Sequence, residues 1–150
     1  MKQGEQEILV KMLTEDEGYE EFPYDDATGQ PVIAPIGNLT IGIGINLQET
    51  GISYDEAVYL LLNRIKCFEH KLSQFNFFEN LDIVRRCVLF NMCFNLGYFG
   101  LCKFKDMLEA VAAKDYRRAG DEILNSKAAR QLPRRYARLA SMMRTGTIVR

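Results

Sequence analysis

The stretch NLDIVRRCVLFNMCFNLG, residues 80–97, decides the fold. Apolar side chains fall on nearly every side of a helix built from residues 80–96, so the sequence predicts a helix that is buried all round. Gly97 is the glycine expected just past the end of that helix. Such a helix needs others around it, and helical periodicity predicts three more, near residues 103–113, 115–125 and 134–144. We therefore place residues 80–96 at the centre of a helical lobe.

The chain before this lobe has a different character. An apolar stripe near residues 8–13 predicts a first helix, whereas residues 20–47 hold three of the four prolines with several glycines, a pattern of short strands and turns. Ser53 and Glu56 form a capping box for a helix that runs to about Phe75. At roughly 30 Å, this helix can connect two lobes.

The predicted fold class is therefore α+β and mostly helical, in a single domain over residues 1–150. A small N-terminal lobe with a short antiparallel sheet occupies about residues 14–60. The long connecting helix leads to a helical C-terminal lobe at about 61–150, on which the N-terminal helix packs. A chain of 150 residues has enough surface to bury for one such core and too little for two ordinary domains.

The charged residues are also distributed unevenly between the two predicted lobes. Residues 1–60 carry two lysines against twelve acids, and residues 61–150 carry seventeen bases against eight acids. The basic half can attract an anionic polymer such as cell wall or nucleic acid. Alternatively, the acidic and basic surfaces pair with each other. A helical nucleic-acid-binding domain would need Arg130, Arg134, Arg135 and Arg138 on one exposed face, and we expect no nucleic-acid partner.

The composition argues against several other classes of protein. The sequence has no apolar run of about eighteen residues, so no membrane insertion is expected. The start, MKQGEQEILVKML, lacks the features of a signal peptide, so synthesis in the cytoplasm is expected. The four cysteines form no CxxC pair and His70 is the single histidine, so we expect no metal, no cofactor and reduced thiols. A Cys67–His70 nucleophile lacks a third group to orient it.

The candidate catalytic residues lie in the predicted N-terminal lobe. Glu17 closes the first helix, Asp26 follows nine residues later, and Thr40 opens a run of alternating isoleucine and glycine. Sugar hydrolysis needs two carboxyl groups from different elements, one to protonate the leaving oxygen and one to direct water or attack. Spacing alone leaves open that these acids form a solvated acidic face.

Seven motifs extend across the chain. They are EDEGY at 15–19, YDD at 24–26, LTIGIG at 39–44, LDIVRR at 81–86, NMCFNLG at 91–97, PRRYAR at 133–138 and RTGT at 144–147. In order and in residue type this set resembles the phage-type lysozymes, the endolysins related to the lysozyme of T-even bacteriophages. The resemblance implies a lysozyme-like fold and a glycoside hydrolase that cleaves the β-1,4 bond between N-acetylmuramic acid and N-acetylglucosamine in peptidoglycan.

The resemblance also assigns catalytic roles. Glu17 would be the general acid, and Asp26 and Thr40 would hold the attacking water, which gives inversion at the anomeric carbon. As structural support, Arg135 would lie beside Glu17, and Arg138 would pair with Asp16.

The resemblance further implies substrate contacts at Asn46, Phe94 and Asn95. Core packing is the alternative for Phe94, and a polar helix end for Asn95. The implied partner is the peptidoglycan polysaccharide, bound by a monomer made in the host bacterial cytoplasm that reaches the wall after release.

The chain departs from the family pattern at several positions. An insertion at residues 30–37 would extend a hairpin beside the cleft, and Ala128 stands where the T-even enzyme has a tryptophan. Met107 and Glu122 occupy further sugar-contact positions with changed chemistry. Two other activities remain open on the same fold: a lytic transglycosylase, and a non-catalytic module that binds the wall.

Overall fold

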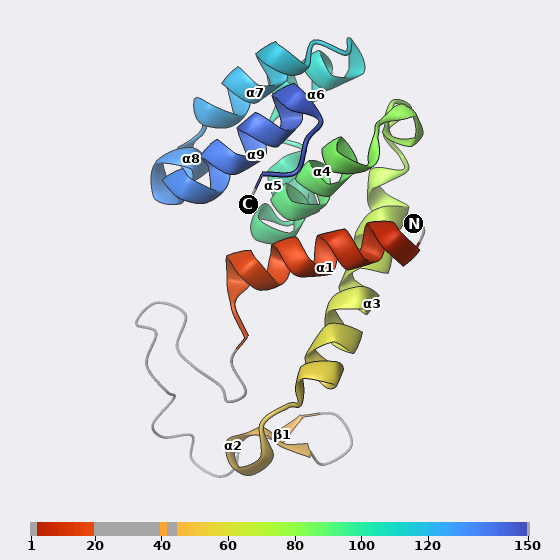
Figure 1. Ribbon diagram of the computed structural model, residues 1–150, viewed down its shortest axis with the longest axis vertical. Coiled ribbons are helices and arrows are strands. Elements are labelled where there is room, and N and C mark those ends of the chain that lie inside the picture. The colour runs from red at the N-terminus through yellow and green to blue at the C-terminus, as the bar shows by residue number, and fades with distance from the viewer. Residues whose placement is uncertain (1–2, 20–39, 42–44, 150) are drawn as a thin grey trace.

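The computed structural model describes residues 3–19, 40–41 and 45–149 (Figure 1). The described elements are, in chain order, α1 (Gln3–Glu17), β1 (Thr40–Ile41), β2 (Ile45–Asn46), α2 (Leu47–Thr50), α3 (Tyr54–Leu72), the 3-10 turn η1 (Phe78–Asn80), α4 (Ile83–Leu96), α5 (Tyr98–Leu101), α6 (Lys105–Ala112), α7 (Tyr116–Leu124), α8 (Lys127–Gln131) and α9 (Pro133–Thr145).

Helix α4 lies at the centre of the helical lobe, as the sequence predicts. It packs against α1, α3, α5 and α9, and eight of its fourteen residues are buried. The helix begins slightly later than predicted because the Asp82 carboxylate accepts a hydrogen bond from the backbone N–H of Arg85 at 3.0 Å and caps it. Gly97 ends the helix with a φ of 71°, a conformation that favours glycine.

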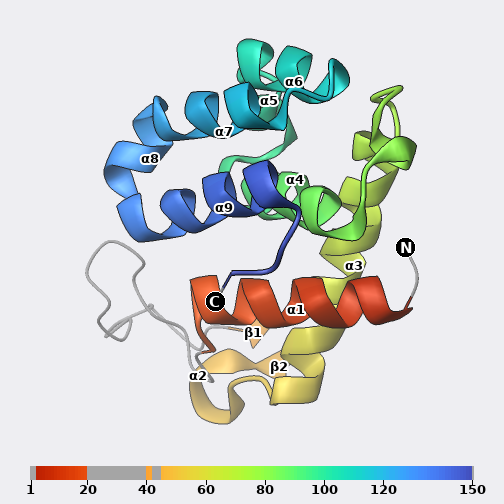
Figure 2. The same cartoon turned by 45° about the horizontal axis from the view of Figure 1, so that its top comes forward.

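The helices predicted after Gly97 are present as α6, α7 and α9. Helices α7 and α9 run alongside each other in both views and pack closely (Figures 1 and 2). The two helices approach closely at Gly120, where a Cβ atom would lie 2.6 Å from Cγ of Arg144, so only glycine fits without a shift. The short helix α8 was not predicted. Ser126 begins it by accepting a hydrogen bond from the backbone N–H of Ala129 at 3.0 Å.

Helix α3 is the predicted connecting helix. The Ser53–Glu56 capping box is present, with the hydroxyl of Ser53 and the carboxylate of Glu56 each bonding the other's backbone N–H. At nineteen residues, α3 is roughly 28 Å long. Figure 1 shows β1 and α2 at one end of α3 and the helices from α4 to α9 at the other. Helix α1 packs on both α3 and α4, and its buried residues are Leu9, Met12 and Leu13.

The α+β fold class is wrong for the part of the chain that the structure describes. That part is helical, and its strand pairing amounts to β1 against β2, two residues each, with Thr40 opposite Asn46 and Ile41 opposite Ile45. Four paired residues are too few to form a sheet layer, and the core of the described residues is built mainly by helices. Most of the segment that predicted strands, residues 20–39 and 42–44, lies outside the described residues.

None of the helices in the described ranges is both long enough and apolar enough to cross a membrane. The division into lobes at about residue 60 stays a prediction.

Candidate active site

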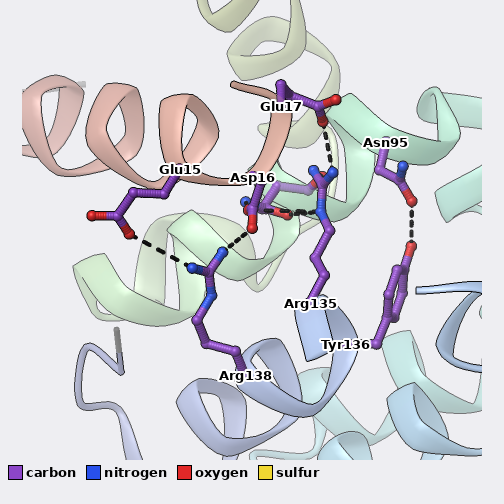
Figure 3. A network of polar contacts seen from close by, with 8 residues as sticks. Glu15, Asp16, Glu17, Asn95, Arg135, Tyr136 and Arg138 are labelled. Atoms are coloured by element: carbon purple, nitrogen blue, oxygen red, sulfur yellow. Dashed lines mark hydrogen bonds and ion pairs between the residues drawn. The ribbon is translucent and has the colours of Figure 1, made fainter. Parts of the chain in front are cut away.

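A cluster of charged side chains joins the end of α1 to the start of α9 (Figure 3). Glu15, Asp16 and Glu17 occupy the last turn of α1. The helix stops there because Gly18 has a φ of 74° and donates its backbone N–H to the carbonyl of Thr14 at 2.9 Å. The three acids therefore project from a helix end toward Arg135 and Arg138 of α9.

Arg135 lies beside Glu17, the position that the resemblance implies. Its Nη1 is 2.6 Å from Oε1 of Glu17. The arginine side chain is only 8% exposed, whereas that of Glu17 is 40% exposed. The guanidinium thus fixes one oxygen of a carboxyl group that remains open to solvent.

Asp16 is the buried member of the acidic trio, with a side chain 6% exposed. Arg138 donates to its Oδ1, and Nε of Arg135 lies 3.6 Å from its Oδ2. Glu15 lies at the rim, 3.6 Å from Nη1 of Arg138. A carboxylate buried between two guanidinium groups is balanced only while both partners remain, so the pairing locks α9 onto α1.

Asn91 completes the cluster, and sequence reasoning missed it. It is the buried polar residue of α4, with 0% exposure. Its Oδ1 accepts from Nε of Arg135 at 2.9 Å, its Nδ2 donates to Asp16, and its backbone carbonyl accepts from Nη2 of Arg135 at 3.4 Å. The available signal was an asparagine within an otherwise apolar helix, since a buried amide must find hydrogen-bond partners.

The three predicted substrate-binding residues have structural contacts. Asn46 caps α2, its Oδ1 accepting from the backbone N–H of Gln48 at 3.1 Å. Phe94 packs edge-on against Phe68, with ring centroids 6.4 Å apart. Asn95 accepts a hydrogen bond from the hydroxyl of Tyr136 at 2.8 Å (Figure 3).

The structure does not bring together all three predicted catalytic residues. Asp26 and the insertion at 30–37 lie outside the described residues. Thr40 is placed by its backbone only, in β1 opposite Asn46. The catalytic roles of Glu17, Asp26 and Thr40 therefore stay predictions.

Burial acts on one phenol next to this cluster and on two thiols of α4. Removal from water raises the pKa of Tyr136, the neighbour of Arg135, to about 12. It also raises the pKa of Cys87 and of Cys93, both on α4, to about 12. All three groups are therefore neutral near pH 7, and the thiols act as small apolar side chains in the core.

A pocket of about 430 Å³ opens in the helical lobe, bounded by the end of α4 and by α5 to α8. Met107 and Ala128 contribute to its apolar lining, and Glu122 to its polar lining. These are the three positions at which the chain departs from the expected sugar contacts. The smaller alanine at position 128 belongs to the wall of this hollow.

The helical fold is lysozyme-like. The sequence profile described as "Phage lysozyme" matches residues 14–138, and the chain belongs to the phage lysozyme family. Family membership supports a lysozyme-like, cell-wall-lytic class of function.

Two relatives from Dictyostelium discoideum are similar to this chain. The protein called "Probable T4-type lysozyme 2" is 30% identical over 163 aligned positions, which cover 93% of this chain and 95% of the relative. "Probable T4-type lysozyme 1" is 34% identical over 71 positions, which cover 47% of this chain and 42% of the relative.

Proposed function

We propose that the protein is a muramidase that hydrolyses the β-1,4 bond between N-acetylmuramic acid and N-acetylglucosamine in peptidoglycan. The observation that carries the proposal is the half-exposed carboxyl group of Glu17 held at the end of α1 by the buried guanidinium of Arg135 at 2.6 Å. Membership of the phage lysozyme family supports the same substrate class.

In the proposed reaction, Glu17 gives its proton to the glycosidic oxygen as the bond to the anomeric carbon breaks. Asp26 and Thr40 hold a water that attacks this carbon from the opposite face, and Asp26 takes the proton that the water loses. The product is inverted at the anomeric carbon. Arg135 keeps the Glu17 carboxyl group in one orientation and does not itself exchange a proton, because its guanidinium stays charged.

The glycan would extend from Glu17 over the helical lobe. Asn95, at the end of α4, lies next to Leu96, which lines the pocket that also contains Met107 and Ala128. A pocket of about 430 Å³ with both apolar and polar lining residues suits one sugar or part of a peptide side chain. We further propose that the enzyme is a monomer, made in a bacterial cytoplasm, which causes lysis once released to the wall.

The experiment compares wild type with Glu17→Gln on purified peptidoglycan, following the loss of turbidity. The matched control is Glu7→Gln, since Glu7 is an exposed glutamate on the same helix, outside the charged cluster. Loss of a general acid lowers the rate by about 10²- to 10⁴-fold, and the control should keep wild-type activity. An active Glu17→Gln enzyme would overturn the assignment.

Mass analysis of the released fragments separates the alternative reactions. Fragments with free reducing ends are the products of hydrolysis. Internal anhydro sugars, lighter by one water, would instead identify a lytic transglycosylase. If wild type binds peptidoglycan from several sources but releases nothing, the protein is a wall-binding module on the same fold.

A further inference from the structure

Four aromatic rings, from residues outside the α1–α9 cluster, contact one another in a row on the helical lobe. Phe75 and Phe77 are stacked, with centroids 5.4 Å apart and an interplanar angle of 9°. The Tyr98 ring lies 6.1 Å from Phe75, and Phe99 lies 5.8 Å from Tyr98. Two rings come from the connection between α3 and η1 and two from α5, so only the tertiary fold unites them. We call this set the aromatic strip.

The strip has a fixed base and an open end. Phe75, Phe77 and Tyr98 are half-buried and pack against the core, whereas Phe99 is 80% exposed. An isolated exposed phenylalanine is common, but an exposed ring that continues a row of three supported rings forms an extended apolar surface. Because the supporting rings are already immobilised, binding a ligand there costs little conformational entropy.

Lysine side chains accompany the strip. Lys103 comes two residues after the end of α5, the helix that carries Tyr98 and Phe99. Nζ of Lys71 lies 5.8 Å above the Tyr98 ring. The acid at the far end, Glu79, is 3.6 Å from Arg86 and is partly neutralised by it. A ligand that lies along the strip therefore meets positive charge.

We propose that the aromatic strip is a second binding surface for the cell-wall polysaccharide, and that it prefers strands bearing negative charge. The C–H faces of pyranose rings carry partial positive charge and stack on the electron-rich faces of aromatic rings. Lys71 and Lys103 complement carboxylate or phosphate groups on the strand. This inference rests on the proposed function for the identity of the polymer.

Continuity with the site favours a polysaccharide over a lipid surface. Gly100, in α5, and Lys103, two residues after its end, follow the strip along the chain and line the pocket that also includes Leu96, the neighbour of Asn95. In this proposal, a strand that leaves that pocket continues onto Phe99 and Tyr98. A lipid surface would need several apolar side chains inserted together, and Phe99 is the single ring of the strip that projects into solvent.

The test measures binding without turnover. Glu17→Gln protein is mixed with purified insoluble peptidoglycan and the bound fraction is obtained by co-sedimentation. Adding Phe99→Ala should weaken binding by about fivefold, the equivalent of about 1 kcal/mol for one lost ring contact. The matched control is Tyr59→Ala, an exposed ring on α3 outside the strip. Similarly, Lys71→Gln should weaken binding at low salt by about two- to fivefold, against Lys11→Gln as control.

Each contrary result overturns the proposal. If Phe99→Ala binds peptidoglycan within about twofold of the parent, the strip does not contribute to wall binding. If Phe99→Ala loses binding to phosphatidylglycerol vesicles but keeps its binding to peptidoglycan, the strip is a lipid-binding surface instead. A Glu17→Gln parent that does not bind peptidoglycan at all would also refute the strip. The proposed muramidase activity is judged separately, by turnover of wild type against Glu17→Gln.

Discussion

Replacing Asn91 with leucine tests whether the α1–α9 cluster stabilises the fold. The change keeps the approximate volume of the side chain but removes the acceptor for Nε of Arg135, 2.9 Å away, and the donor to Asp16. Both partners are charged and more than nine-tenths buried, so water cannot replace the lost contacts. Each hydrogen bond to a charged group contributes about 1.5–3 kcal/mol to the free energy of unfolding, and burial of the leucine side chain offsets about 1–2 kcal/mol of the loss.

The expected net loss is about 3 kcal/mol, a large share of the total of about 5–15 kcal/mol for a domain. For a chain of this length it corresponds to a fall of about 10 °C in Tm. Thermal unfolding followed by circular dichroism measures it directly. The matched control is Asn63→Leu, the same change at a half-buried position on α3, which should alter Tm by less than about 2 °C.

A fall of less than about 2 °C for Asn91→Leu would refute the reasoning, because it would mean that Arg135 and Asp16 do not depend on the amide. If the variant folds, its turnover of peptidoglycan should also fall, since Arg135 loses the contact that orients it toward Glu17. The matched variant Asn63→Leu should keep its activity.

Three further predictions concern buried groups. Asp16→Asn leaves two guanidinium groups without their buried counter-charge and should cost about 3–5 kcal/mol, measured by the urea midpoint; an unchanged midpoint would contradict the ion pairing. Because folding raises the pKa of Tyr136 to about 12, its contribution to stability is complete below about pH 10 and is lost as the pH rises toward 12. Tyr136→Phe should flatten the decline in Tm over this range, and an identical decline would exclude Tyr136 as its source. At pH 8 a thiol reagent should modify exposed Cys67 rapidly and leave Cys87 and Cys93 unmodified until the protein unfolds; rapid native labelling of Cys87 would contradict its burial.

The helices and their ends were the most predictable features of the structure. The central position of α4 follows from an apolar stretch that no single helix face can accommodate, and the start of α3 follows from Ser53 and Glu56, three residues apart. Both depend on interactions within one or two turns of a helix, which are present in the sequence itself. The expected α+β class was wrong because, in the described residues, pairing is limited to two residues each in β1 and β2, and glycines and prolines indicate turns without fixing how far strands extend.

The order and residue types of the motifs identified the family. The resemblance also predicted that Arg135 lies beside Glu17, although the two residues are 118 positions apart in the chain. The tertiary structure alone decided which groups are buried and what they contact. Asn91 became the centre of a charged cluster because α1, α4 and α9 meet there, and the aromatic strip arose because the end of α3 lies against α5. Hydrogen bonds and ring contacts between distant segments depend on how helices pack in space, and helical periodicity within each segment carries no information about that packing.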